Sequence, residues 1–301
     1  MRNPYFILLL ILFLTSPCKT NNPKPHNLNS LQLSILTYNV WALPISLYNH
    51  NQDFRFPKIP KHVENINADI VCLQETFHPK IRKQLINNLT PLYLTKSQYL
   101  CNKIIIPFIV KDCQGGLMTF SKYPILSETF YMFPKNKEYN IIEHIGSKGF
   151  LITKINANGF VIYVINTHLY SGNNDHAEKI RMDQINYINK ITSELTKNDN
   201  YPIFLVGDIN INHPNIDYSP TYNTILKTFN DTESVVDETD FTSDGLTNHY
   251  VPNYECRSKI DYIFYNERNC SIKVVESKRC LDEKPYLSDH FGWISHVQLV
   301  K

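Results

Sequence analysis

The sequence predicts an α+β fold in which two mostly antiparallel sheets pack face to face and helices cover their outer faces, a four-layer α/β/β/α sandwich. Short apolar runs such as 203–206 are too short for helices and are bounded by turn residues, which is typical of strands buried on both faces. Two strand pairs are expected to form hairpins: residues 151–165, around an Asn158-Gly159 turn, and residues 259–275. Longer amphipathic segments lie between the strands and predict the outer helices.

Along the chain, expected strands and expected helices are interleaved. The strands are expected at Leu31–Val40, Asp69–Gln74, Gly115–Phe120, Leu151–Ile155, Phe160–Ile165, Ile203–Val206, Lys259–Tyr265, Ser271–Val275 and Gly292–Val300. The helices are expected at Lys58–Ala68, Pro79–Leu89, Ala177–Leu195 and Thr221–Phe229. This order is compatible with one layered domain.

The composition favours a single domain over residues 31–301. No Gly/Ser tract, long charge block or repeat marks a linker, and a hydrophobic content of 43% supports a sizeable core. The formal charge of +2 gives no strong electrostatic reason to expect a nucleic-acid partner. A local basic patch is the alternative that this net charge leaves open. We expect a monomer with no nucleic-acid partner.

The first residues have the pattern of a secretory signal. Arg2 precedes the apolar run Phe6–Leu14, which is too short to span a bilayer comfortably and is followed by polar sequence. We expect residues 1–20 to be a signal peptide and residues 21–30 a leader, so that the mature protein is secreted, extracellular or periplasmic. The alternatives are an N-terminal anchor that stays in place and a lipid-modified Cys18. No later segment is apolar enough to cross a membrane.

Export would allow disulfide bonds among the seven cysteines. Cys101 and Cys113 bracket one loop and could close it. In the second expected hairpin, Cys256 would lie beside Cys280, so we expect these two to pair. Cys72 lies in an apolar strand and is expected to be a buried free thiol.

Polar side chains that core packing does not explain follow several of the expected strands. Asp208 and Asn210 lie two residues apart at the end of an apolar strand, so they would point to the same side. A turn is the competing interpretation, because Gly, Asp and Asn all favour turns. The same pattern recurs along the chain at Asn39, Glu75, His168, Asp208, Asn210, Asp261, Asp289 and His290. This recurrence favours one site over unrelated turns and caps.

The residue types in this set indicate metal-assisted phosphate chemistry. Carboxylate and amide oxygens are the natural ligands of a hard divalent cation such as Mg²⁺. The sequence has no Cys/His cluster at zinc spacing and no Gly-rich phosphate loop. Two histidines beside such a cation suit phosphate-ester hydrolysis, in which one imidazole activates water. We therefore expect a Mg²⁺ site, with Mn²⁺ and Co²⁺ as alternatives.

Short motifs in a fixed order then carry a specific resemblance. They are Tyr38-Asn39-Val40, Leu73-Gln74-Glu75, Thr167-His168-Leu169, Gly207-Asp208-Ile209-Asn210, Ile260-Asp261-Tyr262 and Ser288-Asp289-His290. With them, the chain resembles the endonuclease/exonuclease/phosphatase superfamily over roughly residues 31–300. Further marks resemble its secreted sphingomyelinase C (neutral sphingomyelinase) group, namely Asn39-Val40-Trp41-Ala42-Leu43-Pro44, Gly115-Gly116-Leu117, Ser147-Lys148-Gly149-Phe150, and Arg181 with Gln184.

The resemblance implies which residues hold the cation and the water. Glu75 would be the principal metal ligand, helped by Asn39, with Asp289 supporting the metal side. Asp208 and Asn210 would hold and orient the attacking water and the phosphate.

The resemblance also implies the proton-transfer and phosphate-binding residues. His290 would be the general base, oriented by Asp261. His168 would donate to a phosphate oxygen as the transition state forms. Lys148 would also meet the phosphate, with an ordinary solvated lysine as the alternative.

The implied reaction is hydrolysis of sphingomyelin to ceramide and phosphocholine by an enzyme that contacts the membrane surface transiently. The alternatives are a secreted nuclease, another phospholipase C-type or inositol phosphate phosphoesterase on the same scaffold, and a non-catalytic membrane-binding protein.

One segment departs from the secreted bacterial sphingomyelinases that the chain resembles. Those enzymes carry a long aromatic β-hairpin shortly before the Ser-Asp-His motif, whereas here only residues 276–287 intervene, with Tyr286 as their sole aromatic residue. Residues 99–113 could substitute, because an apolar centre is flanked there by Lys103 and Lys111. A core strand interrupted by Pro107 is the competing interpretation.

Overall fold

The computed structural model describes residues 29–43, 51–97, 103–106, 109–111, 114–137, 139, 146–211, 219–233, 235, 237–253 and 255–301. The expected signal peptide and leader, as well as Cys18, Cys101 and Cys113, lie outside the described residues, apart from the last two leader positions.

Two large sheets form the centre of the molecule. The first has the order β14-β15-β1-β2-β5, with β1 at Ser30–Asn39, β2 at Ile70–Gln74, β5 at Met118–Ser121, β14 at Ser271–Cys280 and β15 at Gly292–Val300. Only β1 and β2 are parallel among its neighbouring strands.

The second sheet has the order β10-β13-β9-β8-β7-β6. Its strands are β6 (Ile125–Met132), β7 (Gly149–Ala157), β8 (Phe160–His168), β9 (Ile203–Asp208), β10 (Asn230–Asp231) and β13 (Asp261–Asn266). Here β8 and β9 form the one parallel pair. Both sheets are therefore mixed but mostly antiparallel.

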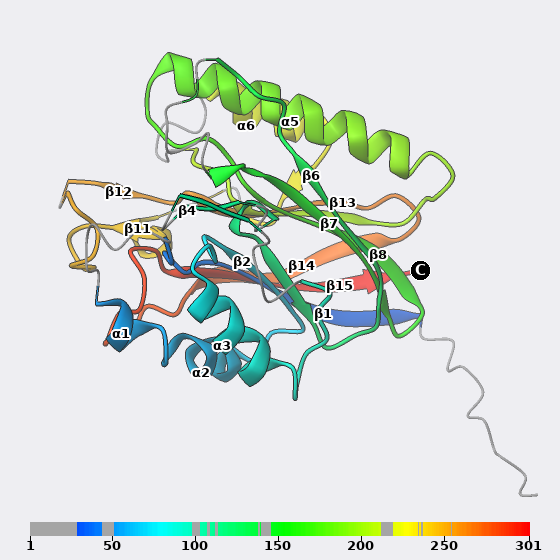
Figure 1. The fold of residues 1–301 in the computed structure, drawn as a ribbon. Coiled ribbons are helices and arrows are strands. Elements are labelled where there is room, and N and C mark those ends of the chain that lie inside the picture. The colour runs from blue at the N-terminus through cyan, green and yellow to red at the C-terminus, as the bar shows by residue number, and fades with distance from the viewer. Residues whose placement is uncertain are drawn as a thin grey trace, which may run out of the picture.

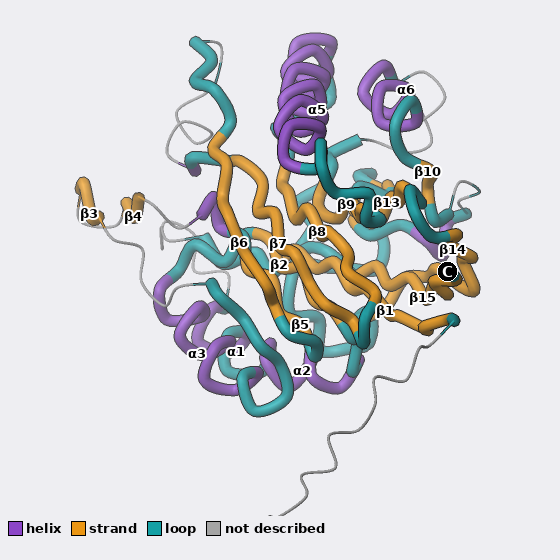
Figure 2. The backbone as a smooth tube through the Cα atoms, turned by 90° about the vertical axis from the view of Figure 1, so that its right-hand side faces the viewer, coloured by secondary structure: helices purple, strands orange, loops and turns teal. Residues whose placement is uncertain are grey.

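Helices cover the two outer faces (Figure 1). α1 (Gln52–Arg55), α2 (Ile59–Ile66) and α3 (Pro79–Leu89) lie on the first sheet. α5 (Asp175–Leu195) and α6 (Pro220–Leu226) lie on the second, and Figure 2 shows the same layers from the side. The predicted four-layer α/β/β/α sandwich is confirmed.

Shorter elements complete the described chain. They are the 3₁₀ helices η1 (Gln114–Gly116) and η3 (Glu238–Asp240), the β11–β12 pair (Ser243–Asp244 and Arg257–Ser258) and the β3–β4 pair (Lys103–Ile106 and Ile109–Lys111). In the tube view β3 and β4 lie apart from both large sheets (Figure 2). The described strands of this segment pair with each other and belong to neither large sheet, while residues 99–102, 107–108 and 112–113 lie outside the described residues.

Alternation along the central strands explains the layering. In β1, Leu33 and Ile35 pack between the two sheets, whereas Leu36 and Tyr38 pack against the helices of the first sheet. Because successive strand side chains point to opposite faces, a strand that is apolar at every position must be covered on both sides. β9 of the second sheet follows the same rule, with Phe204 and Val206 packed towards the first sheet and Ile203 and Leu205 towards α5, so its predicted burial is confirmed.

One predicted hairpin is confirmed and the other is wrong. β7 and β8 pair through the turn at Asn158 and Gly159. β13 and β14, however, belong to different sheets, because the chain crosses from one layer to the other between Asn266 and Ser271. The expected Cys256–Cys280 pairing rested on that hairpin, and both residues are free thiols in the structure. Cys72 is a buried free thiol, as predicted.

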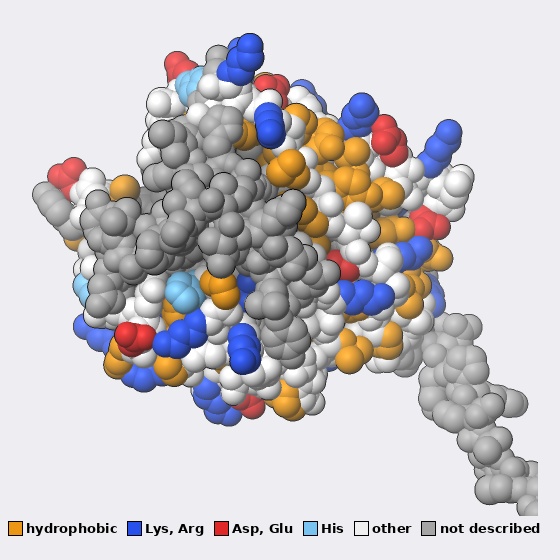
Figure 3. Space-filling model, in the orientation of Figure 1, with side chains coloured by type: hydrophobic (Ala, Val, Ile, Leu, Met, Phe, Trp, Pro, Cys, Tyr) orange, Lys and Arg blue, Asp and Glu red, His pale blue; other side chains and the backbone are white. Residues whose placement is uncertain are grey.

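Charged side chains of both signs are mixed on the surface, in agreement with the small net charge of +2. Figure 3 shows lysine, arginine, aspartate and glutamate side chains scattered over the described part of one face rather than gathered by sign. Among the residues that the structure describes, no helix combines the length and the apolarity needed to cross a bilayer.

Candidate active site

The strand topology brings the predicted polar residues to one edge of the sandwich. β1 ends at Asn39 and its parallel neighbour β2 leads directly into Glu75. β8 ends at His168 opposite Asp208, the last residue of parallel β9. Antiparallel β13 begins at Asp261, which is also paired with Asp208. Parallel strands end together and an antiparallel neighbour starts there, so these residues must meet.

The segment before β15 completes the site. β15 is antiparallel to β1, so residues 288–290 precede it at the edge where β1 ends. The hydroxyl of Ser288 donates to the carbonyl of Asn39 at 2.7 Å and to Oδ1 of Asp289 at 3.2 Å, and the same hydroxyl accepts from the amide of His290 at 3.2 Å. This buried serine joins the last motif to the first.

Asn39 lies between two carboxylates. Its Nδ2 donates to Oε1 of Glu75 and to Oδ2 of Asp208, both at 3.1 Å, while its Oδ1 accepts from the amide of Trp41 at 2.9 Å. Asn39 is fully buried, and the two carboxylates come from different sheets. In this arrangement its amide group holds the two halves of the site together, and its oxygen keeps one lone pair for a cation.

His290 and Asp261 form a buried pair. Nδ1 of His290 lies 2.9 Å from Oδ2 of Asp261, and its Nε2 lies 3.8 Å from Oδ2 of Asp208. Asp261 is fully buried. A carboxylate buried inside an apolar strand needs a hydrogen-bonding or charged partner, and His290 is that partner.

His168 faces the same centre from the opposite side. Its Nε2 lies 3.4 Å from Oδ2 of Asp208 and 3.0 Å from Nζ of Lys148, and its Nδ1 lies 4.0 Å from Oε1 of Glu75. Lys148 also donates to the carbonyl of Leu169 at 2.9 Å. The interpretation of Lys148 as an ordinary solvated lysine is therefore wrong, because its ammonium is held against the site.

Strained backbone positions surround the centre. Glu75 and Asn210 have φ of 54° and 55°, which non-glycine residues rarely adopt. Asn210 is fixed there because its amide donates to Oδ1 of Asp208 and its Nδ2 donates to the carbonyl of Leu169, both at 3.1 Å. Such strain persists only where the surrounding structure enforces it, and it is common at functional sites.

Burial perturbs the acids of the site. It raises the pKa of Asp208 and that of Asp289 to about 6, against a nearby His290 that lowers both, and it raises the pKa of Glu75. Burial alone would lower the pKa of His290, but the carboxylates of Asp261 and Asp208 outweigh it and raise that pKa well above its ordinary value. Burial, followed by the charge of Lys148, lowers the pKa of His168. Groups perturbed in this way are typical of catalytic sites.

The residues present fit a hard divalent cation. Oε2 of Glu75 is buried without a hydrogen-bond partner, in a site where the carboxylates of Asp208 and Asp289 also converge. Mg²⁺ prefers oxygen ligands of this kind, namely a carboxylate oxygen that has no hydrogen-bond partner and lies among other negative charges. Asp208, Asp261 and His290 also place ligand atoms within 4.8 Å of one another. Asp261 already bonds His290, whereas the Glu75 side keeps a buried carboxylate oxygen without a hydrogen-bond partner, so the Glu75 side could hold the cation.

Sequence reasoning missed the buried amides that join the sheets beneath the site. Nε2 of Gln74 in the first sheet donates to Oδ1 of Asn166 in the second at 2.8 Å. Nδ2 of Asn166 donates in turn to the carbonyls of Leu73 and Met118. The sequence contained a signal, because Gln74 directly precedes Glu75 and Asn166 stands two residues before His168, each after an apolar run.

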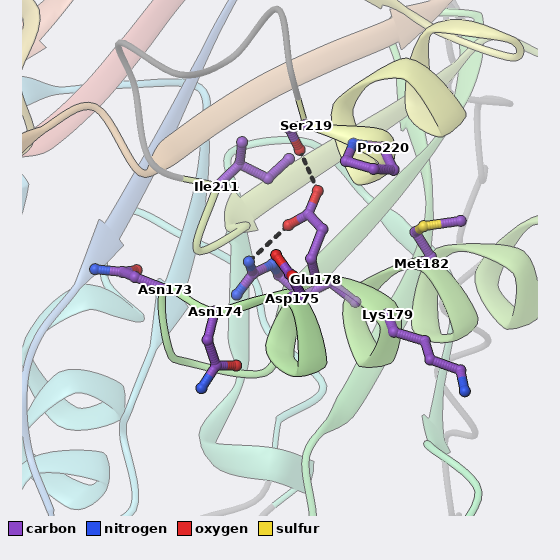
Figure 4. A pocket seen from close by; sticks show the side chains of 10 residues that line it. Asn173, Asn174, Asp175, Glu178, Lys179, Met182, Ile211, Ser219 and Pro220 are labelled. Atoms are coloured by element: carbon purple, nitrogen blue, oxygen red, sulfur yellow. Dashed lines mark hydrogen bonds and ion pairs between the residues drawn. The ribbon is translucent and has the colours of Figure 1, made fainter.

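A cavity of about 400 Å³ lies at the start of α5 and the start of α6 (Figure 4). Glu178 extends across it, and its carboxylate accepts from Ser219 at 2.5 Å, from the amide of Thr221 at 2.9 Å and from Arg181 at 2.7 Å. This carboxylate joins α5 to α6.

Residues 36–290 match the model of the endonuclease/exonuclease/phosphatase family. The chain belongs to this family. The matched range runs from the first strand to His290, so it includes every strand end described above. The resemblance carried by the sequence motifs is confirmed.

Curated relatives lie within the sphingomyelinase group of this family. The chain is 27% identical to sphingomyelinase C 2 of Leptospira interrogans over 93% of its own length and 48% of that protein, so it spans about half of this relative. It is 25% identical to a sphingomyelinase C of Bacillus cereus, over 84% of this chain and 80% of that one.

A solved structure shows the same fold. Beta toxin from Staphylococcus aureus, crystallised with bound magnesium ions, superposes with a TM-score of 0.69 at 22% identity, over 88% of this chain and 99% of the toxin.

Proposed function

We propose that this member of the endonuclease/exonuclease/phosphatase family is a metal-dependent phosphodiesterase that hydrolyses sphingomyelin to ceramide and phosphocholine. The observation that carries the proposal is the single buried cluster of Glu75, Asn39, Asp208 and His290, in which a cation-binding side adjoins a paired histidine. The sphingomyelinase relatives support the choice of substrate.

The protein groups have separate tasks in this reaction. In its neutral form His290 takes the proton of the attacking water through Nε2, while Asp261 fixes the ring through Nδ1. Asp208 lies between the two histidines and orients the water toward phosphorus. His168 and Lys148 offer donors to the phosphate oxygens on the far side. These groups are pre-organised by burial, so little reorganisation is needed as charge develops.

Glu75, with Asn39 and Asp289, would hold the cation. A bound Mg²⁺ would supply positive charge that offsets the phosphate and the surrounding carboxylates. Beta toxin, a neighbour of the same fold, was crystallised with bound magnesium ions, and this supports the choice of Mg²⁺ in the proposal.

We further propose secretion through residues 1–20 and action as a monomer on the membrane surface.

The β3–β4 pair is a candidate contact with the membrane, because it stands apart from both large sheets and its sequence is apolar between two lysines. Ile105→Asp combined with Phe108→Asp should then reduce binding to sphingomyelin vesicles. Unchanged vesicle binding would refute the proposed membrane contact through this pair.

A substrate panel tests the function. Sphingomyelin, lysophospholipid, inositol phosphate and plasmid DNA are each incubated with the protein, with Mg²⁺ or with a chelator. We expect phosphocholine release from sphingomyelin that needs the cation and disappears in Glu75→Ala and His290→Ala. Faster cleavage of plasmid DNA would favour the nuclease alternative instead, and no turnover of any substrate would favour a non-catalytic protein.

A further inference from the structure

Arg55 is a fully buried cation outside the cluster of strand-end residues. It lies in the short helix α1, where its neighbours along the chain are aromatic or polar. Its guanidinium carbon lies 4.7 Å from the ring centre of Trp41 and 5.6 Å from that of Tyr250. A buried guanidinium must have its donors satisfied, so its hydrogen bonds show what it holds in place.

Those bonds go to backbone on both sides of the site. Arg55 donates to the carbonyl of Trp41 at 2.7 Å and to that of Val40 at 3.3 Å, just after β1. It also donates to the carbonyl of Leu287 at 2.8 Å, just before the last motif. A single planar group thus joins two segments that lie more than two hundred residues apart.

Each of these segments carries residues of the site. The backbone of Trp41 has φ of 49°, and its amide fixes Oδ1 of Asn39. Leu287 is followed by Ser288, whose hydroxyl binds both Asn39 and Asp289. The guanidinium therefore sets how the Asn39 side and the Asp289 side approach each other.

The charge of Arg55 also acts on the site. Burial lowers the pKa of Arg55, and the carboxylates of Asp289 and Glu75 are among the groups that oppose this change and favour its charged form. A fixed cation behind the metal side would steady these carboxylates without competing for the ligand positions in front.

We infer that Arg55 is a positioning residue for the metal side of the site, which holds Asn39 and Asp289 at the separation that the cation requires. This inference rests on the proposed function for the identity of the ligands. It concerns metal affinity, however, and metal affinity can be measured without any substrate.

The test compares Arg55→Met and Arg55→Lys with the parent protein. Met fills the volume but has no donors, whereas Lys keeps the charge but cannot reach three diverging carbonyls. Mg²⁺ affinity is measured by titration calorimetry, and kcat and KM are measured with a soluble chromogenic phosphodiester. We expect Arg55→Met to weaken Mg²⁺ binding by about 10-fold or more and to lower kcat far more than KM, with Arg55→Lys intermediate.

Leu85→Ala in α3 is the control for general destabilisation, since Leu85 is fully buried in the layer between α3 and the first sheet. It should lower the thermal midpoint and leave Mg²⁺ affinity unchanged. A folded Arg55→Met with parental Mg²⁺ affinity would overturn the inference, and if that variant does not fold, parental affinity in Arg55→Lys would do the same. Failure to cleave sphingomyelin would count against the proposed function and leave the metal result standing.

Discussion

Asp208 is the residue at which the two halves of the site meet. Its Oδ2 accepts from Asn39 of the first sheet and faces a ring nitrogen of His168 and of His290, while its Oδ1 accepts from the amide of Asn210. It is almost fully buried, and burial raises its pKa to about 6. A carboxylate in this position is costly to the fold, so its presence is best explained by the water-orienting role proposed for it.

The Asp261–His290 pair gives a prediction about catalysis. Asp261→Asn should keep the shape of the site but remove the charge that orients the imidazole, so kcat should fall by about 10²-fold or more. The matched control is Asp231→Asn, which neutralises a half-buried carboxylate on β10, outside the site. Steady-state kinetics on both variants provide the measurement, and equal losses in the two would contradict the assigned role.

Gly207 gives a prediction about stability. It has φ of 146°, and a Cβ there would come within 1.9 Å of the carbonyl oxygen of Thr167 on the paired strand. Gly207→Ala should therefore cost more than about 4 kcal/mol, because the two parallel strands would have to separate. Gly159→Ala, at a turn where the added Cβ meets nothing within 4 Å, should cost only about 1 kcal/mol. Urea unfolding compares them, and similar costs would refute the steric explanation.

For single residues, the sequence predicted a site position wherever a polar residue follows an apolar strand. Asn39, Glu75, Asp208 and Asp261 stand out because core packing cannot account for them. Arg55 gave no such signal, since a lone arginine in an aromatic loop is compatible with an ordinary surface position. Its burial depends on the loop before β15 folding over it, which is long-range information.

Among the elements, strands with apolar runs were predictable and the edge strand was not. β6 is partly exposed along most of its length, so its sequence lacks the alternation or the continuous apolar run that marks a strand. The hairpin error at residues 259–275 has a related cause. Two strands close together in sequence usually pair, but here each finds its partner in a different sheet.

Glu128 on β6 gives a prediction about pH at this scale. Burial raises its pKa from 4.5 to about 7, although hydrogen bonds from Thr153 on β7 and from Ser97 lower it in part. The folded protein therefore keeps a proton that the unfolded chain has released between these pH values. Stability should fall as pH rises from about 4.5 to 7, by up to about 3 kcal/mol.

Glu128→Gln, which resembles the protonated form, should be more stable than the parent at pH 8 and nearly equal to it at pH 4.5. Urea unfolding at both pH values measures this difference. Glu276→Gln, at a half-exposed residue on β14, is the control and should show little change at either pH. A variant that gained nothing at pH 8 would show that the ionised Glu128 carries no cost in the folded protein.

The sandwich as a whole explains why one edge holds the chemistry. Each large sheet contains one parallel pair, β1–β2 in the first and β8–β9 in the second. The buried amides of Gln74 and Asn166 bond across the layers beneath those strand ends and keep the two edges in register. The site is therefore a property of the assembled layers and of no single segment.

Metal removal gives a prediction for the whole molecule. A cation that binds only the folded state should stabilise it, by about 2.7 kcal/mol when its concentration is 100 times its Kd. Thermal unfolding with Mg²⁺ or with a chelator should show this increase in the parent and lose it in Glu75→Gln. An increase of the same size in Glu75→Gln would place the cation elsewhere.

The most direct test of the central claim is the position of the ion itself. Crystals grown with Mn²⁺, which scatters anomalously, should show one strong anomalous peak within coordination distance of the carboxylate of Glu75, on the side that faces Asn39 and Asp289. A peak remote from Glu75, or none at saturating Mn²⁺, would contradict the claim that these strand ends form one metal-dependent site.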